Sequence, residues 1–357
     1  MRRLAAIAIL VLAAGVLVGL ILWVLRGPDV LPSAVSQTQS QHAGQPSTES
    51  LLGQLRHEHF LIRESAARTL RARGWQPRDD AERAWLLVGL QEWEGAVQLG
   101  DPAIEPLAVA FAGPGPTRYH AAAEALGRVG SDDAVRILGE TLRRGPDHLR
   151  YSAARALGDC TNPKAVDMLI TALPDLPPDL FSRACQSLGM HRDPRVLPVL
   201  AKALASQDPD VRQGAACGLG DTRDMGAVTH LARALHDPEP DVRRAAASSL
   251  LEILHREAIP MLLEAVREER LDASVFVTEM HYLGPPAIPA LTGTLRNSSP
   301  RVRLAAVLAL GYIPDPQVIA PLSLALEDED EAVRNTARSV LDEVRPFLEA
   351  EERGNSN

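Results

Sequence analysis

Cysteine and aromatic side chains are scarce in this chain of 357 residues, and each shortage excludes something. The three cysteines, Cys160, Cys185 and Cys217, are odd in number and lack a CxxC spacing, so neither a disulfide framework nor a zinc knuckle is expected. Aromatic residues make up only 4% of the sequence, whereas alanine, leucine and arginine are abundant. Because these three are helix formers, the composition disfavours an all-β sandwich or barrel and predicts a mainly helical protein.

Basic side chains are outnumbered by acidic ones. The formal net charge is −9, and residues 51–357 alone carry 34 basic and 44 acidic side chains. A groove that binds nucleic acid needs clustered positive charge, so the charge balance argues against a nucleic-acid partner. The chain also lacks the motifs GxSxG, HExxH and GxGxxG, which mark common hydrolase, zinc-protease and nucleotide sites.

The first 26 residues contain the longest apolar segment. Arg2 and Arg3 precede an uncharged run from Leu4 to Leu25, which as a helix would be roughly 33 Å long and could cross a hydrocarbon core of about 30 Å. The run is longer than the apolar region of a signal peptide, so we expect a transmembrane anchor at residues 1–26, with membrane contact through residues 4–25. The positive-inside rule then predicts a single-pass protein of the cytoplasmic membrane, with its N-terminus inside and the rest of the chain outside.

Residues 27–50 differ from the segments on either side of them. They are rich in Ser, Gln, Gly and Pro, and they show no apolar periodicity. This composition is typical of a flexible tether, so we expect a linker between the anchor and the folded domain.

From residue 51 onward the sequence repeats itself. The clearest mark is a leucine preceded by small residues and usually followed by glycine, as in HAAAEALG, YSAARALG and LAAVLALG. This register leucine occurs at Leu70, Leu126, Leu157, Leu188, Leu219, Leu250, Leu283, Leu310 and Leu341. The intervals are 56, 31, 31, 31, 31, 33, 27 and 31 residues. A unit of about 31 residues therefore recurs, with one early insertion and one shifted register near the end.

Each unit is predicted to form two short helices. The first carries apolar residues at helical spacing, as in AVDMLITAL, and the second runs through an Ala pair to the register leucine, where glycine is expected to end it. One pair cannot bury its apolar face alone, so the pairs must stack. The predicted fold class is all-α: an α-solenoid, or superhelix, of about nine helical hairpins over residues 51–345, preceded by one transmembrane helix. An irregular insertion is expected near residues 76–100, and a polar, fraying tail at residues 346–357.

In these units the sequence resembles the HEAT-repeat proteins, in the short-unit subclass shared with phycobilin lyases. Segments such as DPDVRQGAACGLGD and DPEPDVRRAAASSL are similar to the family consensus, and the resemblance covers roughly residues 51–345. An arginine seven residues before the register leucine recurs at Arg63, Arg150, Arg212, Arg243, Arg303 and Arg334, with Phe181 and Phe276 at this position in two other units. The resemblance implies a structural role for these arginines, because in the family such a ladder bonds acidic residues of adjacent turns.

No catalytic or metal-binding constellation is visible, and no cofactor is expected. His57 and His59 are two residues apart, so on a helix they would lie on different faces and could not share a metal ion. The HEAT-repeat enzyme deoxyhypusine hydroxylase holds a di-iron centre with repeated His-Glu pairs, whereas this chain has one such pair, His57-Glu58. A lyase or hydroxylase-like enzyme descended from these relatives is the alternative to a protein without catalytic activity.

The second helices are expected to line the concave face of the solenoid. Helical geometry points the residues six and two positions before each register leucine away from the core. In chain order these are His120, Glu124, Tyr151, Arg155, Ser182, Gln186, Gln213, Cys217, Arg244, Ser248, Val277, His281, Leu304, Leu308, Asn335 and Ser339. Val277, Leu304 and Leu308 predict an apolar patch toward the C-terminus. Packing of the two leucines against a neighbouring helix is the alternative.

Together these observations predict a membrane-anchored HEAT-repeat scaffold that binds another protein through the concave face of its solenoid. The hypothesis depends on the anchor, the tether, the acidic repeat array and the lack of a catalytic motif. The partner is expected to be a protein outside the cytoplasmic membrane, and no catalytic role is expected.

Overall fold

The computed structural model describes residues 46–354, and every regular element within them is a helix. The chain divides into two units, Met1–Ser50 and Leu51–Asn357. The anchor predicted at residues 1–26, and the linker as far as residue 45, lie outside the described residues. In the part that is described, no helix has the length and apolar character needed to cross a bilayer. Helix α2 begins at Thr48, so the last three residues of the predicted linker are helical.

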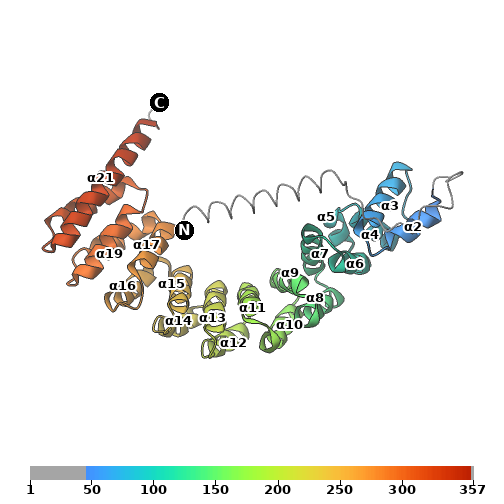
Figure 1. Ribbon diagram of the computed structural model, residues 1–357, viewed down its shortest axis with the longest axis horizontal. Helices are drawn as coiled ribbons and strands as arrows, with labels where there is room; N and C mark the ends of the chain where they lie inside the picture. The colour runs from blue at the N-terminus through green and yellow to red at the C-terminus, as the bar shows by residue number, and fades with distance from the viewer. Residues whose placement is uncertain (1–45, 355–357) are drawn as a thin grey trace, which may run out of the picture. The chain divides into compact units, whose positions relative to one another are not determined.

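The unit Leu51–Asn357 is built from helix pairs that follow one another in chain order, in agreement with the predicted all-α solenoid (Figure 1). The first helices of the pairs are α2 (Thr48–Leu55), α6 (Ile104–Ala112), α8 (Asp132–Arg144), α10 (Lys164–Ala172), α12 (Val196–Ala203), α14 (Val228–Ala234), α16 (Ile259–Arg267), α18 (Ile288–Thr294) and α20 (Ile319–Leu324). The second helices are α3 (Phe60–Ala72), α7 (Pro116–Val129), α9 (Asp147–Gly158), α11 (Pro178–Met190), α13 (Pro209–Thr222), α15 (Pro240–Leu254), α17 (Ala273–Leu283), α19 (Pro300–Gly311) and α21 (Glu331–Gly354). From α7 to α21, each second helix packs against the next one.

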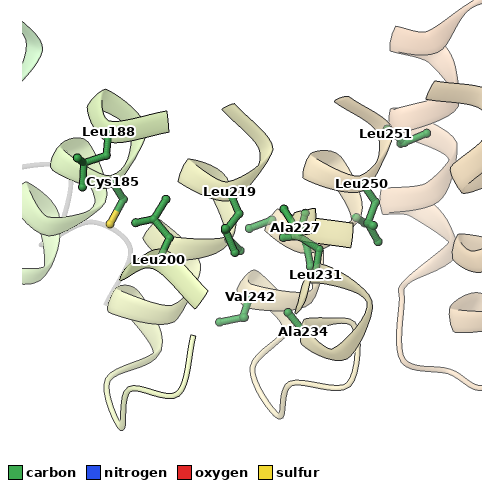
Figure 2. Packing of buried hydrophobic residues seen from close by; sticks show 14 of the residues in the cluster. Cys185, Leu188, Leu200, Leu219, Ala227, Leu231, Ala234, Val242, Leu250 and Leu251 are labelled. Atoms are coloured by element: carbon green, nitrogen blue, oxygen red, sulfur yellow. The ribbon is translucent and has the colours of Figure 1, made fainter. Parts of the chain in front are cut away.

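The core lies between the first and second helices and is continuous along the array. One cluster of buried residues extends from Ala84 to Leu341, and a smaller cluster around Leu70 and Trp85 covers the N-terminal end. Figure 2 shows Leu188 and Leu219 recurring at equivalent places in successive second helices. Each fully buried leucine contributes roughly 1.5–3 kcal/mol, so the repeated leucine accounts for much of the stability of each unit.

The unit that contains α17 corrects the predicted register. Leu283 is only partly buried, whereas Met280 is fully buried and lies 30 residues from both Leu250 and Leu310. Met280 therefore occupies the register position, and the apparent shift in the period disappears. In consequence Phe276 does not replace a ladder arginine, since it stands four residues before the register, where other units bury an alanine.

The glycine after the register leucine has a second role besides the one predicted. We expected it to end the second helix, and α9 and α19 do end at Gly158 and Gly311, but α7 and α13 continue beyond Gly127 and Gly220. A Cβ atom on Gly220 would lie 2.5 Å from Oγ of Ser249 on α15, and one on Gly189 would lie 2.4 Å from the carbonyl oxygen of Gly218 on α13. Glycine is required at this position because the next second helix approaches too closely for a side chain.

Two joints between α7 and α21 lack this glycine, since His281 stands at the position on α17 and Leu251 at the position on α15. The side chain of Leu251 is buried. Figure 2 shows Leu251 lying apart from the register leucine Leu250, beside the following ribbon. In line with this larger residue, α15 packs less extensively against α17 than against α13. We call this place the α15–α17 joint.

The predicted insertion at 76–100 folds as two helices, α4 (Asp80–Gly89) and α5 (Trp93–Leu99). Asp79 caps α4 by accepting a hydrogen bond from the backbone N–H of Glu82 at 2.8 Å. Trp85 is buried in the N-terminal cluster, and Trp93 packs against the main core. At the other end of the chain, α21 extends to Gly354, so most of the tail expected to fray at residues 346–357 is helical.

Candidate functional site

Two of the recurring arginines tie successive units together by two-point ion pairs. Arg212 on α13 donates from Nε and Nη2 to the carboxylate of Asp237 at 2.7 and 2.8 Å. Arg303 on α19 makes the same contact with Asp328, with both distances at 2.8 Å. In each pair the arginine lies on one second helix and the aspartate lies in the turn before the next one. Because these contacts lie inside the array, they are structural rather than part of a binding surface.

The other ladder arginines depart from the role that the resemblance implied. Nη1 of Arg63, Arg243 and Arg334 donates to carbonyl oxygens of the turn that precedes its own helix. Arg150 donates from Nε to the carbonyl of Leu142 at 2.9 Å, and its ion pair at 3.6 Å is with Asp147 of its own helix. The constant function of this arginine is therefore to satisfy carbonyl oxygens in the last turn of the first helix or in the turn that follows it, and an acidic partner in the next unit is added where the sequence supplies one.

Of the sixteen predicted face residues, the structure leaves eight exposed, seven half-buried and one buried. His120, Glu124, Tyr151, Arg155, Arg244, His281, Asn335 and Ser339 are exposed, whereas Ser182, Gln186, Gln213, Cys217, Ser248, Leu304 and Leu308 are half-buried. Val277 is only 7% exposed, so its assignment to the surface is wrong. The error comes from the register, because Met280 places Ser274 and Thr278 at the two outward positions of α17, and both are exposed.

The predicted apolar patch near the C-terminus is therefore not formed as an open surface. Val277 is buried, and Leu304 and Leu308 pack against the main core, as the alternative interpretation held. The two half-buried leucines instead help to pack α19 against the main core.

Sequence reasoning missed a third outward position, two residues after the register residue. It lies one helical turn beyond the predicted stripe and so belongs to the same face. Its occupants from α7 to α21 are Arg128, Asp159, Met190, Asp221, Glu252, Tyr282, Tyr312 and Glu343, and all but the half-buried Asp221 are exposed. The signal was present in the spacing, but the assumption that glycine ends the helix cut the stripe short. We call the three positions together the second-helix face.

Several contacts on this face join one unit to the next. Nδ1 of His120 lies 2.6 Å from Oγ of Ser152. The Arg183 guanidinium lies over the Tyr151 ring at 4.7 Å and also donates to its hydroxyl. Such cross-unit contacts hold surface side chains in defined positions, which lowers the entropy lost when a partner binds.

The His120–Ser152 contact does not form a nucleophilic site. Ser152 is only 3% exposed, and it lies in the middle of α9, where the backbone N–H groups are engaged in the helix and cannot stabilise an oxyanion. Among residues 46–354 there is no group of three or more His, Cys, Asp or Glu side chains able to hold a metal ion. Burial also raises the pKa of Cys160, Cys185 and Cys217, which keeps these thiols neutral.

Two carboxylates on neighbouring helices give the face a local negative charge. Asp221 on α13 and Glu252 on α15 both stand two residues after the register leucine. Burial raises the pKa of Asp221. Burial and, next, the charge of Asp221 raise the pKa of Glu252. In the described part of the chain neither carboxylate makes an ion pair or a side-chain hydrogen bond, and Arg183 and Arg223 act on Asp221 only over a longer range. The half-buried Asp221 and the exposed Glu252 therefore have no close partner among residues 46–354.

The repeat array matches a known protein family. The family profile described as HEAT repeats matches residues 104–189, 140–215, 166–252, 198–275 and 272–342, which together cover more than half of the chain. No curated protein matches the sequence.

Several solved structures are similar in fold. Kap95p, from a structure of its complex with RanGDP, is 12% identical with a TM-score of 0.44; the match covers 83% of this chain and 50% of Kap95p, so this chain spans about half of that length. Human deoxyhypusine hydroxylase is 19% identical with a TM-score of 0.25, and the match covers 83% of this chain and 94% of the hydroxylase. The complex of CpcE and CpcF of phycocyanin lyase from Nostoc sp. is 20% identical with a TM-score of 0.34, and the match covers 78% of this chain and 100% of that one. Likenesses at this level concern the fold and carry no information on activity or partners.

Proposed function

Because the chain belongs to the HEAT-repeat family, we propose that it is a non-enzymatic scaffold that binds another protein through its second-helix face. The observation that carries this proposal is a pair of exposed tyrosines. Tyr282 is 79% exposed and Tyr312 is 62% exposed, and they occupy the same outward position on successive units. Tyrosine is enriched at the energetic centres of protein interfaces, because its ring offers a large contact area and its hydroxyl a hydrogen bond.

His281, a residue predicted for this face from the sequence, lies between the two tyrosines. Its Nδ1 is 2.7 Å from the carbonyl oxygen of Tyr312, and its ring meets the edge of the Tyr282 ring with 5.7 Å between centroids. The ring contact positions the Tyr282 ring, and the hydrogen bond ties α17 to the backbone at Tyr312. A surface that is ordered before binding loses less entropy on association.

The location of the scaffold is a further part of the proposal. The apolar run at residues 4–25 would anchor the chain in the cytoplasmic membrane and hold the repeats outside it. A protein partner is proposed in preference to a nucleic acid, because acidic side chains outnumber basic ones in the repeat array. Protease treatment of intact cells stripped of their outer layers tests the topology: digestion of the repeats supports it, and protection overturns it.

Site-specific photocrosslinking in cells tests the binding face. A photoreactive amino acid is placed at Tyr282 or Tyr312, and at Leu324 as a matched control. Leu324 is a similarly exposed large side chain at the end of α20, a first helix. We expect one protein to be crosslinked from both tyrosine positions and not from Leu324. Equal crosslinking from all three positions, or none from the tyrosines, would contradict the proposed face.

The enzymatic alternative needs a separate measurement. Metal analysis and an absorption spectrum of the purified full chain test for a bound cofactor. Neither stoichiometric iron nor a chromophore is expected, and the presence of either would overturn the non-enzymatic part of the proposal in favour of a hydroxylase-like or lyase-like activity.

A further inference from the structure

An open hollow of about 470 Å³ lies at the α15–α17 joint. Its wall is mainly apolar, with Met225, Ile253, Leu254, Leu283 and Pro286, and it is completed by His255, Arg256 and Glu257. Met225 belongs to the short 3₁₀ turn after α13 and is 64% exposed. The hollow lies at the joint where Leu251 stands at the glycine position of α15 and where α15 packs less extensively against the next second helix than against the previous one.

The surroundings of the hollow carry more negative than positive charge. Four carboxylates belong to the hollow or its surroundings: Glu257 in the wall, Asp221 and Glu252 in the last turns of α13 and α15, and Asp224 just after α13. Two guanidinium groups oppose them, that of Arg256 in the wall and that of Arg223 just after α13. Asp224 is already engaged, since its carboxylate caps the backbone N–H of Gly226 at 2.8 Å. Asp221 and Glu252 have no close partner among residues 46–354, so they are available to a cation from outside.

The hollow and the free carboxylates are close along the chain. Glu252 is the chain neighbour of Ile253 in the wall, so their Cα atoms are about 3.8 Å apart, and Asp221 precedes Met225 of the wall by four residues. An extended peptide advances about 3.3 Å per residue. A side chain seated in the hollow would therefore have a neighbour one to three residues away that reaches the carboxylates.

We infer that this hollow is a docking point for a segment of the protein partner that presents an apolar side chain followed or preceded closely by lysine or arginine. The apolar side chain fills the space beside Met225, Leu254 and Leu283, and the cation pairs with Asp221 and Glu252. This inference rests on the proposed scaffold function and names the chemistry of the partner. The apolar wall supplies affinity by excluding water, and the carboxylates supply specificity for a basic segment.

Synthetic peptides test the inference without knowledge of the natural partner. The probe is a fluorescein-labelled peptide of twelve residues that holds two leucines and four arginines in a Gly/Ser background. One comparison peptide has Glu in place of Arg, and a second has Ser in place of Leu. Fluorescence anisotropy with the full chain in mild detergent should show saturable binding of the probe, and binding at least about tenfold weaker for each comparison peptide, which corresponds to about 1.4 kcal/mol.

Matched variants place the binding at the hollow. Met225→Ser should weaken probe binding several-fold, whereas Met190→Ser, at a similarly exposed methionine on α11, should leave it unchanged. Glu252→Gln should weaken it, and Glu124→Gln, an exposed glutamate on α7, should not. Circular dichroism confirms that each variant folds.

Three results would overturn the docking point: no saturable binding, equal binding of the acidic peptide, or no effect of Met225→Ser. The outcome is separable from that of the proposed function. Crosslinking of a partner from Tyr282 and Tyr312 together with any of these three results would contradict the docking point and leave the scaffold in place.

Discussion

Arg212 on α13 and Asp237 in the turn before α15 form a two-point ion pair that bridges successive units, with both side chains about 10% exposed. The carbonyl oxygen of Asp237 also accepts a hydrogen bond from Nη1 of Arg243, whose Nε in turn donates to the carbonyl of Arg270 in the following unit. One aspartate therefore connects a chain of contacts from α13 to the turn before α17. This chain explains why an arginine recurs at the same position even where no acidic partner is present.

Loss of Asp237 should be costly, because it would leave the Arg212 guanidinium buried without its counter-ion. We expect Asp237→Ala to lower the free energy of unfolding by about 3 kcal/mol, as is usual for a broken buried pair. The matched control is Asp167→Ala, which breaks the exposed pair with Arg195 and should cost less than about 1 kcal/mol. Urea denaturation followed by circular dichroism measures both, and equal losses would contradict a special role for the buried pair.

The glycine after the register leucine gives a second stability test. In Gly220→Ala the added Cβ would lie 2.5 Å from Oγ of Ser249, so α13 and α15 must move apart. We expect a loss of about 1–3 kcal/mol, the usual cost of overpacking. Gly293→Ala is the control, since no atom lies within 4 Å of its added Cβ and the residue is inside α18; it should stabilise the protein by roughly 0.5–1 kcal/mol. A stabilising effect of Gly220→Ala would show that the close approach does not constrain the helices.

The exposed tyrosines predict a separation of binding from folding. Tyr282→Ser combined with Tyr312→Ser should change the free energy of unfolding by less than about 0.5 kcal/mol, because both rings are largely in solvent. The same double variant should weaken binding of the crosslinked partner by about 30-fold, as expected for hot-spot residues. A photoreactive residue at Thr278, which is exposed on the same face, provides the readout through its crosslinking yield. An unchanged yield would show that the tyrosines are incidental.

The sequence was sufficient for the repeat architecture because a large buried side chain recurs at nearly constant spacing. It was insufficient at α17, where Met280 fills the place of leucine equally well and a search for leucine selected Leu283 instead. This error of three residues in the register led to the wrong prediction that Val277 is on the surface. The second failure concerned distances between helices: nothing local in the sequence distinguishes a glycine that ends a helix from Gly220, which admits its neighbour. The same misreading of the glycine hid the outward tyrosines, whose position the spacing did contain. The hollow at the α15–α17 joint depends on distances between helices and so emerged only from the structure.

The last prediction concerns Asp221, whose pKa is raised mainly by burial. A carboxyl group with a higher pKa in the folded than in the unfolded state binds protons more tightly when folded. Its effect on stability is therefore neutral below the unfolded pKa of about 3.9, grows more unfavourable as the pH rises from there toward the folded pKa, and is constant above it. Asp221→Asn should accordingly raise Tm at pH 7, by an amount that shrinks as the pH approaches 3.5.

Asp159→Asn provides the comparison, since Asp159 holds the same outward position on α9 and is exposed; its Tm should not change. If the docking point is correct, Asp221→Asn should at the same time weaken binding of the basic probe peptide. Gain of stability with loss of binding is the expected signature of a residue retained for function at a cost to folding. A variant that loses stability at pH 7, or binds the probe as well as the parent chain, would show that Asp221 serves the packing of α13 against α15 instead.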